Sequence, residues 1–164
     1  MARQFARTPR AARAARAALV LAAGLLFAGC RVTLEPPPDF VELEERDWSS
    51  YAYRAADARG VVLGVRAERN PERGTLEFWV EVLKGRLRAD RGYALLEENP
   101  VTASNGVRGR TLVFGRDEGH EPYLFAVTAF VTGSDLYLVE WGGKKLDVER
   151  ARAGLDAAVT GFAP

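Results

Sequence analysis

Two side chains that often carry chemistry occur once each in this chain, the thiol of Cys30 and the imidazole of His120. A serine-type triad would have to use His120 as its base, yet the Gly-x-Ser-x-Gly turn that exposes a nucleophile is missing. Transition-metal sites recruit three or four protein ligands, often several histidines or cysteines. His120 stands among acidic residues in a predicted turn, where we expect it to be solvated. We therefore expect no catalytic residue, no metal and no cofactor, and a hydrolase that uses His120 is the least favoured function.

Neighbouring carboxylates are the other candidates for catalysis, because glycoside cleavage needs two acids that flank one cleft. The chain contains the pairs Glu44-Glu45 and Glu97-Glu98. Adjacent residues of a strand point to opposite faces of a sheet, so neither pair is expected to converge. The sequence thus favours a protein without enzymatic activity.

The surroundings of Cys30 are more specific than those of His120. Cys30 follows an arginine-rich start and an apolar run over residues 17–28, which at about a dozen residues is shorter than the roughly 20 needed to span a bilayer. The arrangement resembles a bacterial lipoprotein signal, although Phe27 stands where leucine is usual. The resemblance implies that residues 1–29 are cleaved and that Cys30 carries a diacylglycerol anchor. An ordinary secretory signal or an uncleaved anchor is the alternative.

Removal of residues 1–29 would change the charge of the protein. It takes away five of the 23 basic residues and none of the 22 acidic ones, which leaves a net charge of −4. This balance gives no support to a nucleic-acid partner, which calls for a basic stripe. If Cys30 is lipidated, Arg31 replaces the aspartate that commonly retains such proteins in the inner membrane. The periplasmic face of the outer membrane is therefore the favoured location.

The remaining sequence divides into a tether and one domain. Residues 30–39 contain three consecutive prolines, which favour an extended, semi-rigid spacer without a core of its own. Residues 40–164 are enough for a single compact domain. Alternating apolar residues predict strands near residues 51–55, 61–69, 93–97, 107–116, 122–132 and 136–141.

Helical spacing predicts one helix over residues 75–89, with Asn70 or Thr75 as its N-cap and Gly92 at its end. It predicts another helix that starts with Asp147 as its N-cap and has Leu146 and Ala151 as a hydrophobic staple. Gly133 and Ser134 form a predicted two-residue hairpin loop that pairs Thr132 with Asp135. No regular alternation of strands and helices runs through the chain. The pattern predicts an α+β domain in which an antiparallel sheet of five to six strands is covered by two helices on one face.

The order of these elements resembles a family group. A hairpin, a helix that leads into Gly92-Tyr93, strands that contain Arg108-Gly109-Arg110 and a closing helix are similar to the PsbP and DcrB group of small sandwich proteins. The resemblance covers residues 40–163 and carries no catalytic signature. It implies a binding or assembly role on the periplasmic side of the envelope, without a defined reaction.

Aromatic residues are the remaining candidates for recognition. Trp48, Tyr51 and Tyr53 follow the acidic segment before the first hairpin, and such residues serve both cores and interfaces. Our leading hypothesis is a non-enzymatic envelope lipoprotein that binds another envelope protein or assists its assembly. The alternative is a lipoprotein that binds a small molecule or peptide in a pocket between the sheet and the helices.

Overall fold

The computed structural model describes residues 34–44 and 50–164, apart from the side chain of Asp90. These residues form seven strands and two helices. The elements are, in chain order, β1 (Phe40–Glu42), β2 (Tyr53–Asp57), β3 (Val62–Arg69), α1 (Leu76–Arg91), β4 (Ala94–Thr102), β5 (Arg108–Glu118), β6 (Glu121–Thr132), β7 (Asp135–Lys144) and α2 (Lys145–Gly161).

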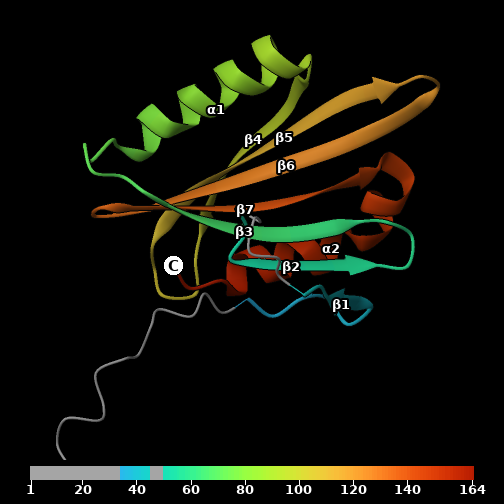
Figure 1. The fold of residues 1–164 in the computed structure, drawn as a ribbon, viewed down its shortest axis with the longest axis horizontal. Helices are drawn as coiled ribbons and strands as arrows, with labels where there is room; N and C mark the ends of the chain where they lie inside the picture. The colour runs from blue at the N-terminus through green and yellow to red at the C-terminus, as the bar shows by residue number, and fades with distance from the viewer. Residues whose placement is uncertain (1–33, 45–49) are drawn as a thin grey trace, which may run out of the picture. The chain divides into compact units, whose positions relative to one another are not determined.

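All seven strands belong to one antiparallel sheet with the order β1-β2-β3-β7-β6-β5-β4. Figure 1 shows the sheet between the two helices. The predicted α+β class and antiparallel sheet are confirmed. The number of strands is higher than the predicted five to six, and one of the seven is the three-residue strand β1, which pairs with β2 at an edge of the sheet.

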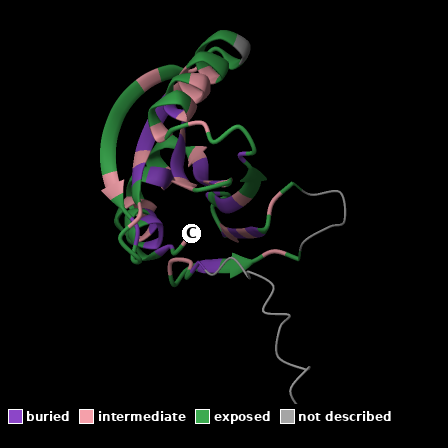
Figure 2. Ribbon diagram, turned by 90° about the vertical axis from the view of Figure 1, so that its left-hand side faces the viewer, coloured by how far each residue is buried: buried purple, intermediate pink, exposed green. Residues whose placement is uncertain are grey.

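The two helices lie on opposite faces of the sheet, so the expectation that both cover one face is wrong (Figure 1). Strand β6 explains the difference. Ala126 and Phe130 belong to the apolar cluster that includes α2, whereas Val127 and Ala129 belong to the cluster that includes α1. A strand that is apolar on both faces needs cover on both faces. Figure 2 shows buried stretches along the strands in the middle of the domain.

Local signals set the limits of α1. The side chain of Thr75 accepts a hydrogen bond from the backbone N–H of Phe78 at 3.2 Å, and Gly92 ends the helix with a φ of 66°. Asn70, the other residue considered as an N-cap, instead holds the preceding loop, because its side-chain oxygen accepts from the backbone N–H of Gly74 at 2.9 Å. The predicted helix is therefore confirmed, with two more residues at its C-terminal end.

The hairpin between β6 and β7 has the predicted register. Thr132 pairs with Asp135, and Phe130 pairs with Tyr137. Gly133 has a φ of 57°, the positive value that a two-residue loop of this kind requires at its first position.

Two predicted boundaries are wrong. Strand β4 continues through Pro100 to Thr102, which is tolerated because β4 lies at the edge of the sheet. Helix α2 begins at Lys145, so Asp147 lies in its first turn and is not its N-cap. Leu146, expected to pack as part of a hydrophobic staple, is 59% exposed.

Part of the segment expected to be a plain tether packs against the domain. Leu34 is only 6% exposed and belongs to the apolar cluster that includes α2. A Cβ atom placed on Gly154 of α2 would lie 3.0 Å from the Cβ of Pro37, so the proline rests directly on the helix. The expectation that residues up to 39 contribute nothing to the core is wrong for Leu34, and Pro37 adds a contact with α2.

The turn between β2 and β3 depends on a buried carboxylate and gives the first prediction. Asp57 is 7% exposed and accepts hydrogen bonds from the backbone N–H groups of Val61 and Arg59 and from the Arg59 Nε, at 2.8, 3.0 and 2.8 Å. Burial alone would raise the pKa of Asp57, but these hydrogen bonds and the charge of Arg59 lower it overall. The carboxylate therefore stabilises the fold at neutral pH, and this contribution is lost as the pH falls below the ordinary carboxyl range.

We expect Asp57→Ala to lower the free energy of unfolding by about 2 kcal/mol at pH 7. Urea unfolding of the wild-type protein and the variant should show this difference shrinking in acid. Glu72→Ala, which removes an exposed carboxylate, is the control and should have little effect at either pH. A difference for Asp57→Ala that does not change with pH would contradict this account of the turn.

Candidate functional site

Helix α1 covers its face of the sheet incompletely. It contacts β4, β5 and β6, while β7, β3 and β2 continue the same sheet beyond them. Hollows therefore lie along both flanks of α1, one toward β4 and one toward β7 and β3.

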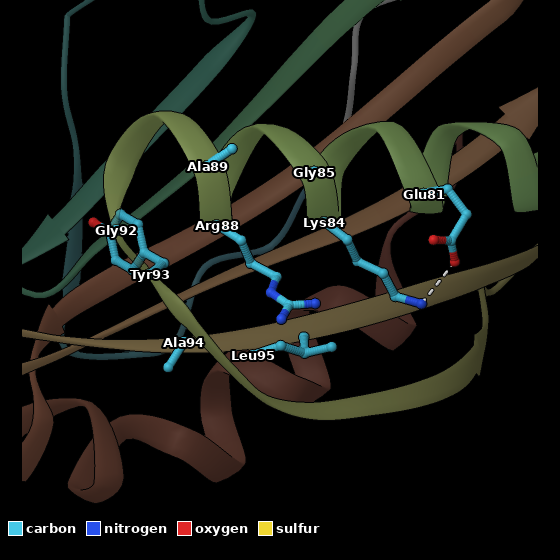
Figure 3. Close-up of a pocket in the computed structure, with 9 residues that line it drawn as sticks. All are labelled: Glu81, Lys84, Gly85, Arg88, Ala89, Gly92, Tyr93, Ala94 and Leu95. Carbon is cyan, nitrogen blue, oxygen red and sulfur yellow. Dashed lines mark hydrogen bonds and ion pairs between the residues drawn. The ribbon is translucent and has the colours of Figure 1, made fainter.

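The hollow toward β4 has a volume of about 1010 Å³ and is open to solvent. Figure 3 shows Lys84 and Arg88 extending from α1 toward the strand that carries Leu95. The ammonium of Lys84 is paired with Glu81 at 2.8 Å and with Glu98 of β4 at 2.7 Å. These ion pairs hold the helix against the edge strand. The charged residues on this flank are therefore explained by their role in the fold.

The hollow on the other flank combines buried and charged groups, and we call it the basic groove. Its volume is about 440 Å³. It is lined by Ser50, Tyr51, Arg66, Leu83, Arg86, Leu87, Arg91, Phe125, Val127 and Glu140. A smaller hollow shares Tyr51, Phe125 and Glu140 with it and adds Arg54.

A hydrogen-bonded cluster forms the floor of the basic groove. Glu140 lies on the central strand β7 and is only 6% exposed. One of its carboxylate oxygens accepts a hydrogen bond from the hydroxyl of Tyr51 at 2.7 Å, and the other accepts from the guanidinium of Arg66 at 2.5 Å. A buried charge is stable only when it is paired and hydrogen-bonded, and both requirements are met here.

The ring of Tyr51 is held in place by the backbone beneath it. A Cβ atom on Gly64 would lie 2.8 Å from two ring carbons of Tyr51, so a larger residue at this position would displace the ring. The guanidinium carbons of Arg54 and Arg66 lie 5.5 and 5.9 Å from the ring centre, within the range of cation–π attraction. Tyr51 is thus fixed by its ring and by its hydroxyl.

The electrostatics of the cluster keep its groups in defined protonation states. Burial, the negative charge of Glu140 and the hydrogen bond to it raise the pKa of Tyr51 to about 12. Burial alone would lower the pKa of Arg66, but its hydrogen bond to Glu140 and the charge of that carboxylate raise it overall. Tyr51 is therefore a neutral hydrogen-bond donor, and Arg66 is a cation, throughout the physiological range.

The aromatic residues singled out in the sequence do not form one surface. Tyr51 lies in the basic groove. Tyr53 is 8% exposed and belongs to the core cluster on the opposite face of the sheet. Residues two apart in a strand share a face, but Tyr51 precedes β2, which begins at Tyr53, so strand alternation does not govern its side chain. Trp48 and the lipidation candidate Cys30 lie outside the described residues.

The described residues that were considered for catalysis do not line the basic groove. His120 is exposed in the turn between β5 and β6, where Glu121 pairs with Lys144 at 3.0 Å. Glu97 pairs with Arg152 of α2 and Glu98 with Lys84 of α1, so these neighbours point to opposite faces, as predicted. Within residues 34–44 and 50–164, no three or more acidic, histidine or cysteine side chains are grouped in a way that could hold a metal ion.

The sequence analysis did not identify Arg66 and Glu140 as site residues. A signal for Glu140 was present, because it is the one charged residue in the predicted strand over residues 136–141. A carboxylate inside a central strand must find a partner. The partners, Arg66 and Tyr51, are 74 and 89 residues away along the chain, so no local sequence pattern could predict them.

Comparison with known proteins establishes the fold. No protein-family model and no curated protein sequence matches the chain. Among solved structures, LpqN of Mycobacterium tuberculosis, described as involved in cell envelope biogenesis, has a TM-score of 0.63 at 13% identity, over 81% of this chain and 83% of LpqN. The cyanobacterial PsbP of Synechocystis has a TM-score of 0.55 at 15% identity, over 79% of this chain and 84% of PsbP. The chain has a PsbP-like fold.

The predicted resemblance to the PsbP group is therefore confirmed for the fold. Among the residues that the structure covers, neither helix has the length and apolar character needed to cross a membrane.

The shifted pKa of Tyr51 gives the second prediction. Tyr51→Phe removes the hydroxyl that bonds to Glu140, and we expect a loss of about 1 kcal/mol in the free energy of unfolding at pH 7. Because the pKa of Tyr51 is raised in the folded protein, the hydroxyl stabilises the fold below pH 10 and this contribution is lost as the pH rises toward about 12. Near-ultraviolet titration of the wild-type protein and the variant should differ by one tyrosine that ionises near pH 12. If the tyrosine that the variant lacks instead ionised near pH 10 in the wild-type protein, the hydrogen bond between Tyr51 and Glu140 would be contradicted.

Proposed function

We propose that this protein is a non-enzymatic, lipid-anchored protein of the cell envelope, and that the basic groove beside α1 binds another envelope protein or assists its assembly. The observation that carries the proposal is the incomplete cover of the sheet by α1. It leaves a fixed tyrosine and several arginines at the surface. Tyrosine and arginine are enriched where proteins bind one another.

Support for an envelope location comes from two sources. Cys30 follows a stretch that resembles a lipoprotein signal. LpqN, which shares the fold, is described as involved in cell envelope biogenesis. Arg31 next to the proposed lipid favours the outer membrane, with the domain on the periplasmic side.

A binding role fits the cluster better than a catalytic one. The phenol of Tyr51 has a pKa of about 12, far from the value near 7 that suits an acid or base in catalysis. Glu140 is engaged by two donors and is not poised to accept a proton from a substrate.

The alternative is a lipoprotein that binds a small molecule or a peptide in the same groove. The volume of the basic groove, about 440 Å³, favours a small-molecule or peptide ligand, because ligand pockets commonly measure about 300 to 1,000 Å³. Such pockets are mostly apolar, however, whereas three arginines and a glutamate line this one. A protein surface is therefore the better-supported ligand.

The third prediction concerns the anchor. Cys30→Ser removes the proposed acceptor of the lipid, so we expect the variant to incorporate no radiolabelled palmitate and to remain at the size of the uncleaved chain. The wild-type protein should be labelled and shortened by residues 1–29. A wild-type protein that is exported without taking up the label would contradict lipid anchoring.

The fourth prediction tests the binding face. A photoreactive benzoylphenylalanine in place of Ser50, at the basic groove, should crosslink a specific envelope protein in intact cells. The matched control has the same substitution at Ser134, which is exposed in the β6–β7 turn. We expect a discrete adduct from position 50 and none from position 134. Equal adducts from both positions, or none from position 50, would contradict the assignment of this face.

A further inference from the structure

We infer that the basic groove binds an extended acidic segment of the partner protein, with arginines on both sides of Tyr51 pairing with its carboxylates. The inference rests on the proposed function and specifies the chemistry of the partner. It follows from four observations on the groove: its charge, the spacing of its arginines, its apolar lining and the fixed position of Tyr51.

The charge of the groove is opposite to that of the domain. The chain after residue 29 has a net charge of −4, yet among the described residues one carboxylate, that of Glu140, lines the groove beside three arginines. Glu140 is committed to Arg66 and Tyr51. Across the described residues, no ion pair is formed by Arg86 or Arg91 on α1 or by Arg54 on β2. No described carboxylate neutralises these three cations, so they are the groups that we expect to pair with an anionic ligand.

The spacing of the arginines matches an extended chain better than a single anion. Arg86 and Arg91 are five residues apart on α1, which separates their backbones by about 7.5 Å along the helix axis. In an extended peptide, side chains on one side recur about every 6.6 to 6.8 Å. Two acidic residues that alternate with apolar ones could therefore face both arginines.

Apolar side chains line the basic groove beside Arg86 and Arg91. Leu83 and Leu87 line the groove from α1, and Phe125 and Val127 line it from β6. A phosphate group is bound by donors that converge on one point, whereas these cations are spread along a partly apolar channel. The lining thus favours an acidic peptide with interspersed apolar residues over a phosphate-bearing lipid headgroup.

Tyr51 is held in place before any ligand binds. Its ring rests on Gly64, and its hydroxyl is bonded to Glu140. A fixed aromatic surface loses little entropy on binding. The guanidinium of Arg54 lies beside this ring, so the cations on the two sides of Tyr51 belong to one continuous surface.

The test uses the full lipidated protein in a neutral detergent. The probe is a fluorescent peptide of alternating glutamate and leucine, whose binding is followed by anisotropy, and the same peptide with lysine in place of glutamate is the negative probe. We expect Arg86→Glu/Arg91→Glu to weaken binding of the acidic peptide by about tenfold or more. The matched control Arg88→Glu reverses a charge on the other flank of α1 and should change binding by less than about twofold. Thermal melts establish that each variant is folded.

Two outcomes of the binding test would overturn the inference. One is acidic-peptide binding that Arg86→Glu/Arg91→Glu leaves unchanged. The other is binding of short-chain phosphatidylglycerol, but not of the peptide, in a manner that depends on Arg86 and Arg91, which would assign the groove to a lipid headgroup. If the adduct from position 50 persists in the charge-reversed variant, the proposed function stands and this inference fails. If the adduct is absent while the peptide binds as expected, the inference on ligand chemistry stands and the envelope-partner function fails.

Discussion

The buried carboxylate of Glu140 is the constraint on which the α1 face of the structure depends. It stands on the central strand β7, where an apolar residue would ordinarily be expected. Because an isolated buried carboxylate is very costly, Arg66 of β3 and Tyr51 must both reach it. Tyr51 can do so because Gly64 leaves room for its ring. The site thus depends on strands that lie side by side in the sheet but are distant in the sequence.

The placement of the helices determines how much of this cluster is exposed. Helix α2 and the buried side chain of Leu34 cover one face. On the other face, α1 packs over β4, β5 and β6 and leaves the cluster at its flank, where the side chain of Arg66 is 27% exposed. An ion pair of this kind is weak support for stability, because well-packed apolar residues often serve equally well. Its position beside an open basic groove is consistent with a role in recognition.

Local signals in the sequence were sufficient for most of the elements but not for the site. Thr75 and Gly92 marked the limits of α1 because caps act within a few residues, and Gly133 defined the β6–β7 register because a two-residue loop leaves one pairing. The face of the sheet on which each helix packs and the burial of Leu34 depend on tertiary packing, which a local sequence pattern cannot predict. The partners of Glu140 were hidden for the same reason.

The central claim is that the Tyr51–Arg66–Glu140 cluster is retained for binding and not for folding. The most direct test is the apolar triple variant Tyr51→Phe/Arg66→Met/Glu140→Leu, which removes every charge and hydroxyl of the cluster and keeps its approximate volume. The account predicts a midpoint of thermal unfolding equal to or above that of the wild-type protein, because apolar replacement of a buried ion pair is often neutral or stabilising, together with loss of the crosslinked adduct from position 50. A strongly lowered midpoint with the adduct retained would contradict it.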